Sequence, residues 1–112
     1  PLGDFIVSLQ ESMALPEDCL VLPSHGLPFV GVRQRCHTLI QHHQERLELV
    51  MAETKTPRTV DYLMRKMFPQ ELDEHQISFA LGETVAHVNY LVEKGELLRH
   101  TNSHGHWELQ AA

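Results

Sequence analysis

Histidine is the residue type in this sequence that offers the most chemistry. Nine histidines occur among the 112 residues, and a neutral imidazole is the commonest side-chain metal ligand in proteins. Three placements stand out. His25 is a lone histidine in a segment rich in proline, and His42 and His43 are adjacent. His100, His104 and His106 form a trio near the C-terminal end.

The adjacent pair and the trio favour structural roles over metal binding. Neighbouring residues on a helix point about 100° apart, so His42 and His43 do not converge on one ion. The HExxH zinc motif is not formed, because Arg46 stands four residues after His42. His43 falls on an apolar stripe, which favours a packed and hydrogen-bonded imidazole. The trio falls on a predicted turn, which favours solvated side chains over an adventitious metal site.

The segments around His25 are predicted to hold it on a rigid loop. Residues 19–22 form a short apolar run between breakers, which predicts a buried strand. Residues 23–28 include two prolines and a glycine, which fix the path of the loop. Nearer the start of the chain, Asp4 is placed to cap a short helix over residues 5–14.

A long helix is predicted over residues 32–53. Apolar residues recur there at steps of three and four, which gives a helix one continuous apolar stripe. The stripe consists of Cys36, Leu39, Ile40, His43, Leu47, Val50 and Met51. Residues 55–58 are expected to end the helix and to act as a short linker.

Residues 56–112 have the pattern of a separate domain. Thr59 is an N-cap candidate for a helix through Met67, and Asp73 or Glu74 is expected to open a helix over residues 75–94. Gly82 marks a point where this helix could divide, because glycine weakens a helix by about 1 kcal/mol relative to alanine. The apolar positions of this helix repeat at helical spacing: Ile77, Leu81, Val85, Val88, Leu91 and Val92.

A β-hairpin is predicted at the C-terminal end. Gly95 stands where a glycine in the left-handed region would end the preceding helix. Residues 96–100 and 106–109 are expected to form two strands, joined by a turn rich in Asn, Ser and Gly. Three helices followed by a hairpin is the order of a winged-helix domain. The predicted fold class is therefore mainly α with a small β-hairpin (α+β).

Charge and composition argue against several functions. The net charge is −6, and an acidic domain does not attract nucleic-acid phosphates by its overall field. Residues 70–94 contain five acids, and Lys94 is the one Lys or Arg among them, which argues against a DNA recognition helix. No apolar run in this sequence suits a membrane span, and Cys19 and Cys36 match no disulfide framework. We also expect no signal peptide. We therefore expect a cytoplasmic protein without a membrane partner.

Three segments together resemble the downstream part of metallo-β-lactamase-fold hydrolases. They are residues 4–9, residues 42–46, and residues 20–28 with the sequence Leu-Val-Leu-Pro-Ser-His-Gly-Leu-Pro. Residues 56–112 are similar to the winged-helix domain that follows the catalytic domain in the β-lactamase-like and hydroxyacylglutathione-hydrolase-like branch. The resemblance implies a domain organisation of a catalytic-domain remnant with its terminal strand and loop (1–30), a long connecting helix (31–55) and the winged-helix domain (56–112).

The resemblance also implies that His25 is a zinc ligand. In such enzymes a late histidine, on a loop after a short buried strand, completes the second zinc site. The family usually has a glycine before this histidine, and this chain has Ser24. The family's HxHxDH signature does not occur here, and Asp4 does not match the bridging aspartate because it precedes the strand. We therefore assign no catalytic residue, and we expect two-ion zinc binding only in the full-length parent.

The resulting hypothesis is a non-catalytic C-terminal fragment of a zinc-dependent hydrolase that acts on a thioester, ester or phosphodiester. Its expected partner is the upstream catalytic domain of the same polypeptide, and the winged domain would support that domain and shape substrate access. One alternative is a free-standing winged-helix module that binds a protein or DNA. Another is a small metal-binding or dimerisation module, in which chains pair through an exposed 36–51 stripe.

Overall fold

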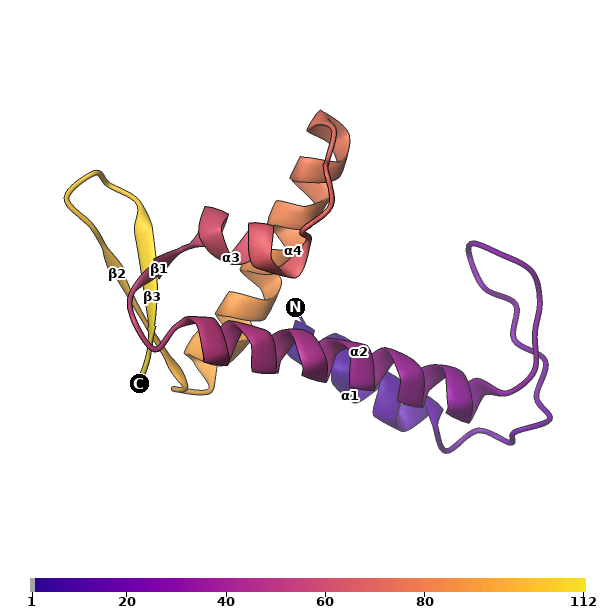
Figure 1. The fold of residues 1–112 in the computed structure, drawn as a ribbon. Helices are drawn as coiled ribbons and strands as arrows, with labels where there is room; N and C mark the ends of the chain where they lie inside the picture. The colour runs from indigo at the N-terminus through magenta and orange to yellow at the C-terminus, as the bar shows by residue number, and fades with distance from the viewer. Residues whose placement is uncertain (1) are drawn as a thin grey trace. The chain divides into compact units, whose positions relative to one another are not determined.

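The computed structural model describes residues 2–112, which contain four helices and a small antiparallel sheet. The helices are α1 (Leu2–Ser12), α2 (Val32–Glu53), α3 (Val60–Met67) and α4 (Glu74–Glu93), and the strands are β1 (Arg58–Thr59), β2 (Leu97–Thr101) and β3 (Trp107–Ala111) (Figure 1). This content confirms the predicted class, mainly α with a small β component. No helix within the described residues combines the length and apolar character that crossing a bilayer requires.

The chain divides into two compact units, one extending to Gln44 and the other comprising Glu45–Ala112. In the first unit, α1 and the segment after it pack on the N-terminal part of α2. The buried side chains of this core are those of Leu9, Val32 and Cys36, and half-buried apolar side chains pack against them: Met13, Val21, Leu39 and Ile40. The apolar residues therefore hold α1, the loop and α2 in one unit.

Polar contacts of Glu17 and Arg33 tie the loop to the start of α2. The guanidinium Nε of Arg33 donates to the carbonyl oxygen of Met13 at 3.1 Å. The backbone N–H of Arg33 donates to the Glu17 carboxylate at 3.2 Å, and the N–H of Gly31 donates to the Glu17 carbonyl at 3.1 Å. A carboxylate beside the first N–H groups of α2 also suits the positive end of the helix dipole.

Two predictions for the first unit are wrong in detail. The strand predicted over residues 19–22 is reduced to an isolated bridge between Val21 and Phe29, and the side chains of Leu20 and Leu22 are exposed. An apolar run becomes a strand only when neighbouring backbone supplies a ladder of hydrogen bonds, and here Phe29 alone does so. Helix α1 already includes Leu2, so Asp4 lies in its first turn and is not its N-cap.

Helix α2 confirms the predicted long helix, but the predicted exposure of its apolar stripe is wrong. The side chains of Cys36, Leu47 and Val50 are buried. The remaining members of the stripe are half-buried: Leu39, Ile40, His43 and Met51. The stripe is therefore largely covered within the chain.

In the second unit, β3 is the central strand of a sheet with the order β1-β3-β2. β2 pairs with β3 from Leu97 opposite Ala111 to Thr101 opposite Trp107, and β1 pairs with the other edge of β3. The turn between β2 and β3 is organised by Asn102, whose side-chain oxygen accepts the N–H groups of His104 and His106 at 2.9 and 3.0 Å. The hairpin was predicted, whereas β1 was not.

The ends of α3 and α4 follow the predicted capping chemistry. Thr59 caps α3 by accepting the N–H of Tyr62, and Asp73 caps α4 in a capping box with Gln76. Gly95, with φ of +76°, ends α4, and the N–H of Glu96 returns to the carbonyl of Leu91 at 2.9 Å. The predicted division at Gly82 is wrong, because α4 runs through it without interruption. One interior glycine costs too little to break a helix that is packed on either side.

The buried face of α4 differs from the face that its large apolar residues indicated. The buried residues are Ala80, Thr84, His87, Val88 and Leu91, whereas Ile77 and Leu81 are exposed. Small side chains at positions 80 and 84 allow close approach of neighbouring elements, which large residues would prevent. Buried side chains of α2, α3 and the sheet complete the apolar residues of this unit: Leu47, Val50, Leu63, Met64, Leu97 and Leu109.

Candidate functional site

His25 lies at the tip of a loop whose base is the bridge between Val21 and Phe29. The N–H of Val21 donates to the carbonyl of Phe29 at 2.6 Å, and the N–H of Phe29 donates back at 3.1 Å. The residues between them form no helix or strand, and His25 is exposed. Gly26 follows with φ of +95°, a conformation that side chains with a Cβ disfavour. The predicted loop is therefore present, with the imidazole accessible from outside.

A hollow of about 480 Å³ lies beside this loop, and His25 forms part of its wall. Its apolar walls come from Val21, Leu27, Phe29 and Leu39, and its polar side chains are those of His25 and Arg35. No described residue that lines it is acidic. The loop and the start of α2 thus place an imidazole and a guanidinium at the same apolar hollow.

The metal chemistry available to His25 is limited by the ligands that surround it. Within residues 2–112, His25 belongs to no group of three or more His, Cys, Asp or Glu side chains able to share an ion. A catalytic zinc ion requires about three protein ligands and a water molecule. The exposed imidazole suits one position of such a set, and the other ligands would have to come from outside the described residues.

Several of the other histidines have defined contacts. The imidazole of His43 meets the ring of Phe5 edge-on, with centroids 5.6 Å apart, as expected for a packed histidine. In the hairpin, the Nε2 of His100 lies 3.9 Å from the Glu108 carboxylate. His104 and His106 bind the Asn102 side chain through their backbone N–H groups.

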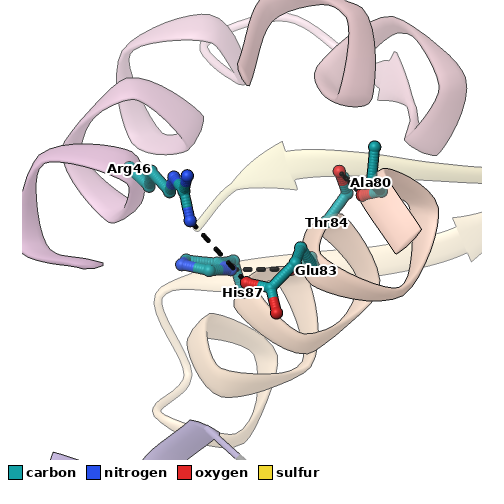
Figure 2. A network of polar contacts seen from close by, with 5 residues as sticks. All are labelled: Arg46, Ala80, Glu83, Thr84 and His87. Atoms are coloured by element: carbon teal, nitrogen blue, oxygen red, sulfur yellow. Dashed lines mark hydrogen bonds and ion pairs between the residues drawn. The ribbon is translucent and has the colours of Figure 1, made fainter. Parts of the chain in front are cut away.

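A buried polar network in the second unit was missed by the sequence analysis (Figure 2). His87 on α4 is fully buried, and its Nδ1 lies 2.6 Å from the carbonyl oxygen of Glu83. The Glu83 carboxylate pairs with the Arg46 guanidinium of α2 at 3.7 Å, and Figure 2 shows the side chains of Arg46 and His87 close to Glu83. The Arg46 guanidinium also lies 5.0 Å from the centre of the Phe68 ring. These contacts join α2, the end of α3 and α4 within this unit.

Burial lowers the pKa of His87, and the neighbouring Arg46 charge acts in the same direction. The hydrogen bond to Glu83 and the negative charge of Glu83 oppose this shift, but they are smaller effects. The folded chain therefore favours the neutral form of this imidazole. Its spacing from Ala80, Thr84 and Leu91 was the signal that would have identified it, because these residues share one helical face.

The comparisons with known proteins agree on one family. Residues 47–112 match the family described as "Metallo-beta-lactamase-like, C-terminal domain". The whole chain is similar to a beta-lactamase domain protein from Burkholderia ambifaria, with 42% sequence identity and a TM-score of 0.96. It is also similar to a metallo-beta-lactamase family protein from Thermus thermophilus, with 33% identity and a TM-score of 0.82.

The lengths of these proteins differ from that of the chain. In both comparisons the whole chain is covered, but only 34% of the other protein, so the chain spans about a third of their length. No curated protein matches the chain.

Proposed function

The chain belongs to the metallo-beta-lactamase-like C-terminal domain family, and on this premise we propose that it is the non-catalytic C-terminal part of a zinc-dependent hydrolase. The observation that carries the proposal is the similarity of the entire chain to about a third of two proteins described as beta-lactamase proteins. The remaining two thirds would supply the catalytic domain and most of the zinc ligands. The parent would act on a thioester, an ester or a phosphodiester.

In this proposal His25 is a zinc ligand of the parent enzyme. The loop that carries this exposed imidazole is closed at its base by the bridge between Val21 and Phe29, and Gly26 allows the backbone to turn next to His25. Bound zinc would polarise the substrate and lower the pKa of a bound water to about 7. What His25 itself contributes is one neutral nitrogen donor, held where a facing domain can reach it.

The second unit is proposed to be a winged-helix domain that supports the catalytic domain and shapes substrate access. Its element order supports this: the end of α2, then β1, α3 and α4, then the β2–β3 hairpin. We also propose that the parent enzyme is cytoplasmic.

The surface that would meet the upstream catalytic domain is the loop that carries His25. Leu22 is 75% exposed and Leu27 is 85% exposed, and Leu20 and Val30 are also exposed. Apolar side chains gathered on one loop are typical of a contact surface. Docking of the catalytic domain here would bury these leucines and bring its zinc ligands to His25.

Zinc analysis of the protein expressed from the whole reading frame that contains this chain tests the proposal. We expect His25→Ala to lower the bound zinc by about one ion, as removal of one ligand from a small set should. His104→Ala is the matched control, because His104 is an exposed histidine on the hairpin turn, and it should leave the zinc content unchanged.

Two results would contradict the proposal. One is a His25→Ala protein that retains the zinc content and hydrolase activity of the unchanged protein. The other is clear turnover of a thioester by the purified 112-residue chain with zinc alone, because one histidine cannot form the site.

A further inference from the structure

A second hollow, of about 370 Å³, lies between the segment that follows α3 and the first half of α4. Its apolar walls come from Phe68 at the end of α3, Leu72 in the connecting segment and Phe79 on α4. Phe79 is 68% exposed, whereas Ala80, which also lines the hollow, is buried. All of these residues belong to the second unit. The hollow is therefore formed by this unit alone, without the loop of His25.

Specific contacts hold the walls of this hollow in place. The guanidinium of Arg46 lies 5.0 Å from the centre of the Phe68 ring. The connecting segment is joined to α4 by the capping box, in which the Gln76 side chain accepts the N–H of Asp73 at 3.0 Å. Leu72 directly precedes this hydrogen-bonded residue. The positions of Phe68 and Leu72 are therefore set by the fold of the second unit.

The charges near the hollow restrict what it can bind. No Asp, Glu, Lys or Arg of residues 2–112 lines it. Three exposed acids adjoin lining residues in the chain: Glu71, Asp73 and Glu74. Residues 67–93 contain no Lys or Arg, so these acids have no basic neighbour within that stretch. An exposed apolar surface attracts large apolar side chains, and carboxylates at its edge favour a partner with positive charge.

We propose that this hollow binds an amphipathic segment of a partner protein. A large apolar side chain of that segment would lie between Phe68 and Phe79, and its Lys or Arg side chains would face the three acids. Pockets for whole small molecules have volumes of about 300–1,000 Å³, and this hollow is at the lower end of that range, which suits a few side chains. The proposal adds a protein-binding role to the second unit and does not involve the zinc proposed for His25.

Binding can be measured on the 112-residue chain with a fluorescein-labelled peptide of Lys-Leu-Leu-Lys repeats. Two matched peptides, one with Glu in place of Lys and one with Ser in place of Leu, separate charge from apolar contact. Fluorescence anisotropy should show the Lys-Leu peptide binding at least about tenfold more tightly than either, because the hollow requires both features. In NMR spectra this peptide should shift the amides of Leu72, Gln76 and Phe79.

Substitution of Phe79 tests the apolar wall. Phe79→Ser should weaken binding of the Lys-Leu peptide by about tenfold, the loss expected when one large apolar side chain no longer contributes to the contact. Leu81→Ser is the matched control, because Leu81 is also exposed on α4 but does not line this hollow, and it should leave binding unchanged. Circular dichroism of both variants verifies that α4 is intact.

Substitution of the flanking acids tests the charge. Glu71→Gln combined with Glu74→Gln should weaken binding by about fivefold at low ionic strength, since exposed ion pairs each contribute little, and added salt should reduce the difference. Asp73 is left unchanged because it caps α4. Glu93→Gln combined with Glu96→Gln removes two exposed acids at the other end of α4. This control should retain the affinity of the unchanged chain.

Three results would overturn the proposal. Equal affinity for the Lys-Leu and Glu-Leu peptides would indicate apolar contact without recognition of charge, and equal affinity for the Lys-Ser peptide would indicate general attraction to an acidic chain. Unaltered binding by Phe79→Ser would place the peptide elsewhere. The protein expressed from the whole reading frame should bind the Lys-Leu peptide equally well, and loss of binding there would also contradict the proposal, because the catalytic domain would then cover the hollow. None of these outcomes depends on the zinc content of the His25→Ala protein.

Discussion

The buried imidazole of His87 should make the free energy of unfolding of the second unit depend on pH. Above about pH 7.5 the imidazole is neutral in both the folded and the unfolded chain. As the pH falls through the ordinary histidine pKa of about 6.5, the unfolded chain binds a proton that the folded chain does not. The free energy of unfolding should therefore fall by at most about 1.4 kcal/mol per pH unit. The decrease ends once the pH reaches the lowered pKa of the folded state.

Urea unfolding at about pH 7.5, 6.5 and 5.5, which brackets the ordinary histidine pKa, measures this effect. His87→Gln removes the titration, so its stability should fall less over this range than that of the unchanged chain. His104→Gln serves as the control, because His104 is exposed, and it should retain the full dependence. Parallel pH profiles for the unchanged chain and His87→Gln would contradict the assignment.

At the scale of elements, α4 depends on the capping box at its start. Asp73 accepts the N–H of Gln76 at 2.8 Å, and the Gln76 side chain accepts the N–H of Asp73 at 3.0 Å. Asp73→Ala should lower the free energy of unfolding by about 1 kcal/mol, the usual cost of a lost N-cap. Chemical denaturation monitored by circular dichroism measures it.

Glu74 provides the matched control for that measurement. It is an exposed acid in the first turn of α4 but not the capping residue. Glu74→Ala should cost only a few tenths of a kcal/mol, through the helix dipole. Equal losses for the two variants would assign the effect to charge and not to the cap.

The sequence predicted correctly those elements whose apolar residues repeat over many positions, or whose ends carry specific capping residues. Helix α2 repeats its apolar spacing over most of its 22 residues, and Thr59, Asp73 and Gly95 mark helix ends by known hydrogen bonds. β1 has only two residues, too few to show a period. The face of α4 was misjudged because its buried side chains are partly small or polar. The loop of His25 was predicted from its prolines and glycine, and its hollow required the three-dimensional contact with α2.

For the whole molecule, the exposed leucines of the His25 loop have a consequence for solution behaviour. Because the 36–51 stripe is largely covered, these leucines are the surface through which we expect the isolated chain to self-associate at high concentration. Leu22→Ser with Leu27→Ser should shift the chain toward the monomer. The reason is that complete burial of a leucine side chain in an interface contributes roughly 1.5–3 kcal/mol, and serine does not supply this contribution.

Light scattering coupled to size-exclusion chromatography measures the association. Leu98→Ser removes an exposed leucine from β2 in the second unit, and this control should leave the association state unchanged. A clean monomer of the unchanged chain at high concentration would contradict the prediction.

The bridge between Val21 and Phe29 also bears on the thermodynamics of ligand capture. Residues 22–28 are closed at their base by this bridge, and Pro23 and Pro28 restrict them further. Ordering one free residue costs about 1–2 kcal/mol of conformational entropy. Much of that cost is met when the chain folds, so a metal ion that reaches His25 binds to a loop that is already ordered. Its affinity is then reduced little by the entropy of loop closure.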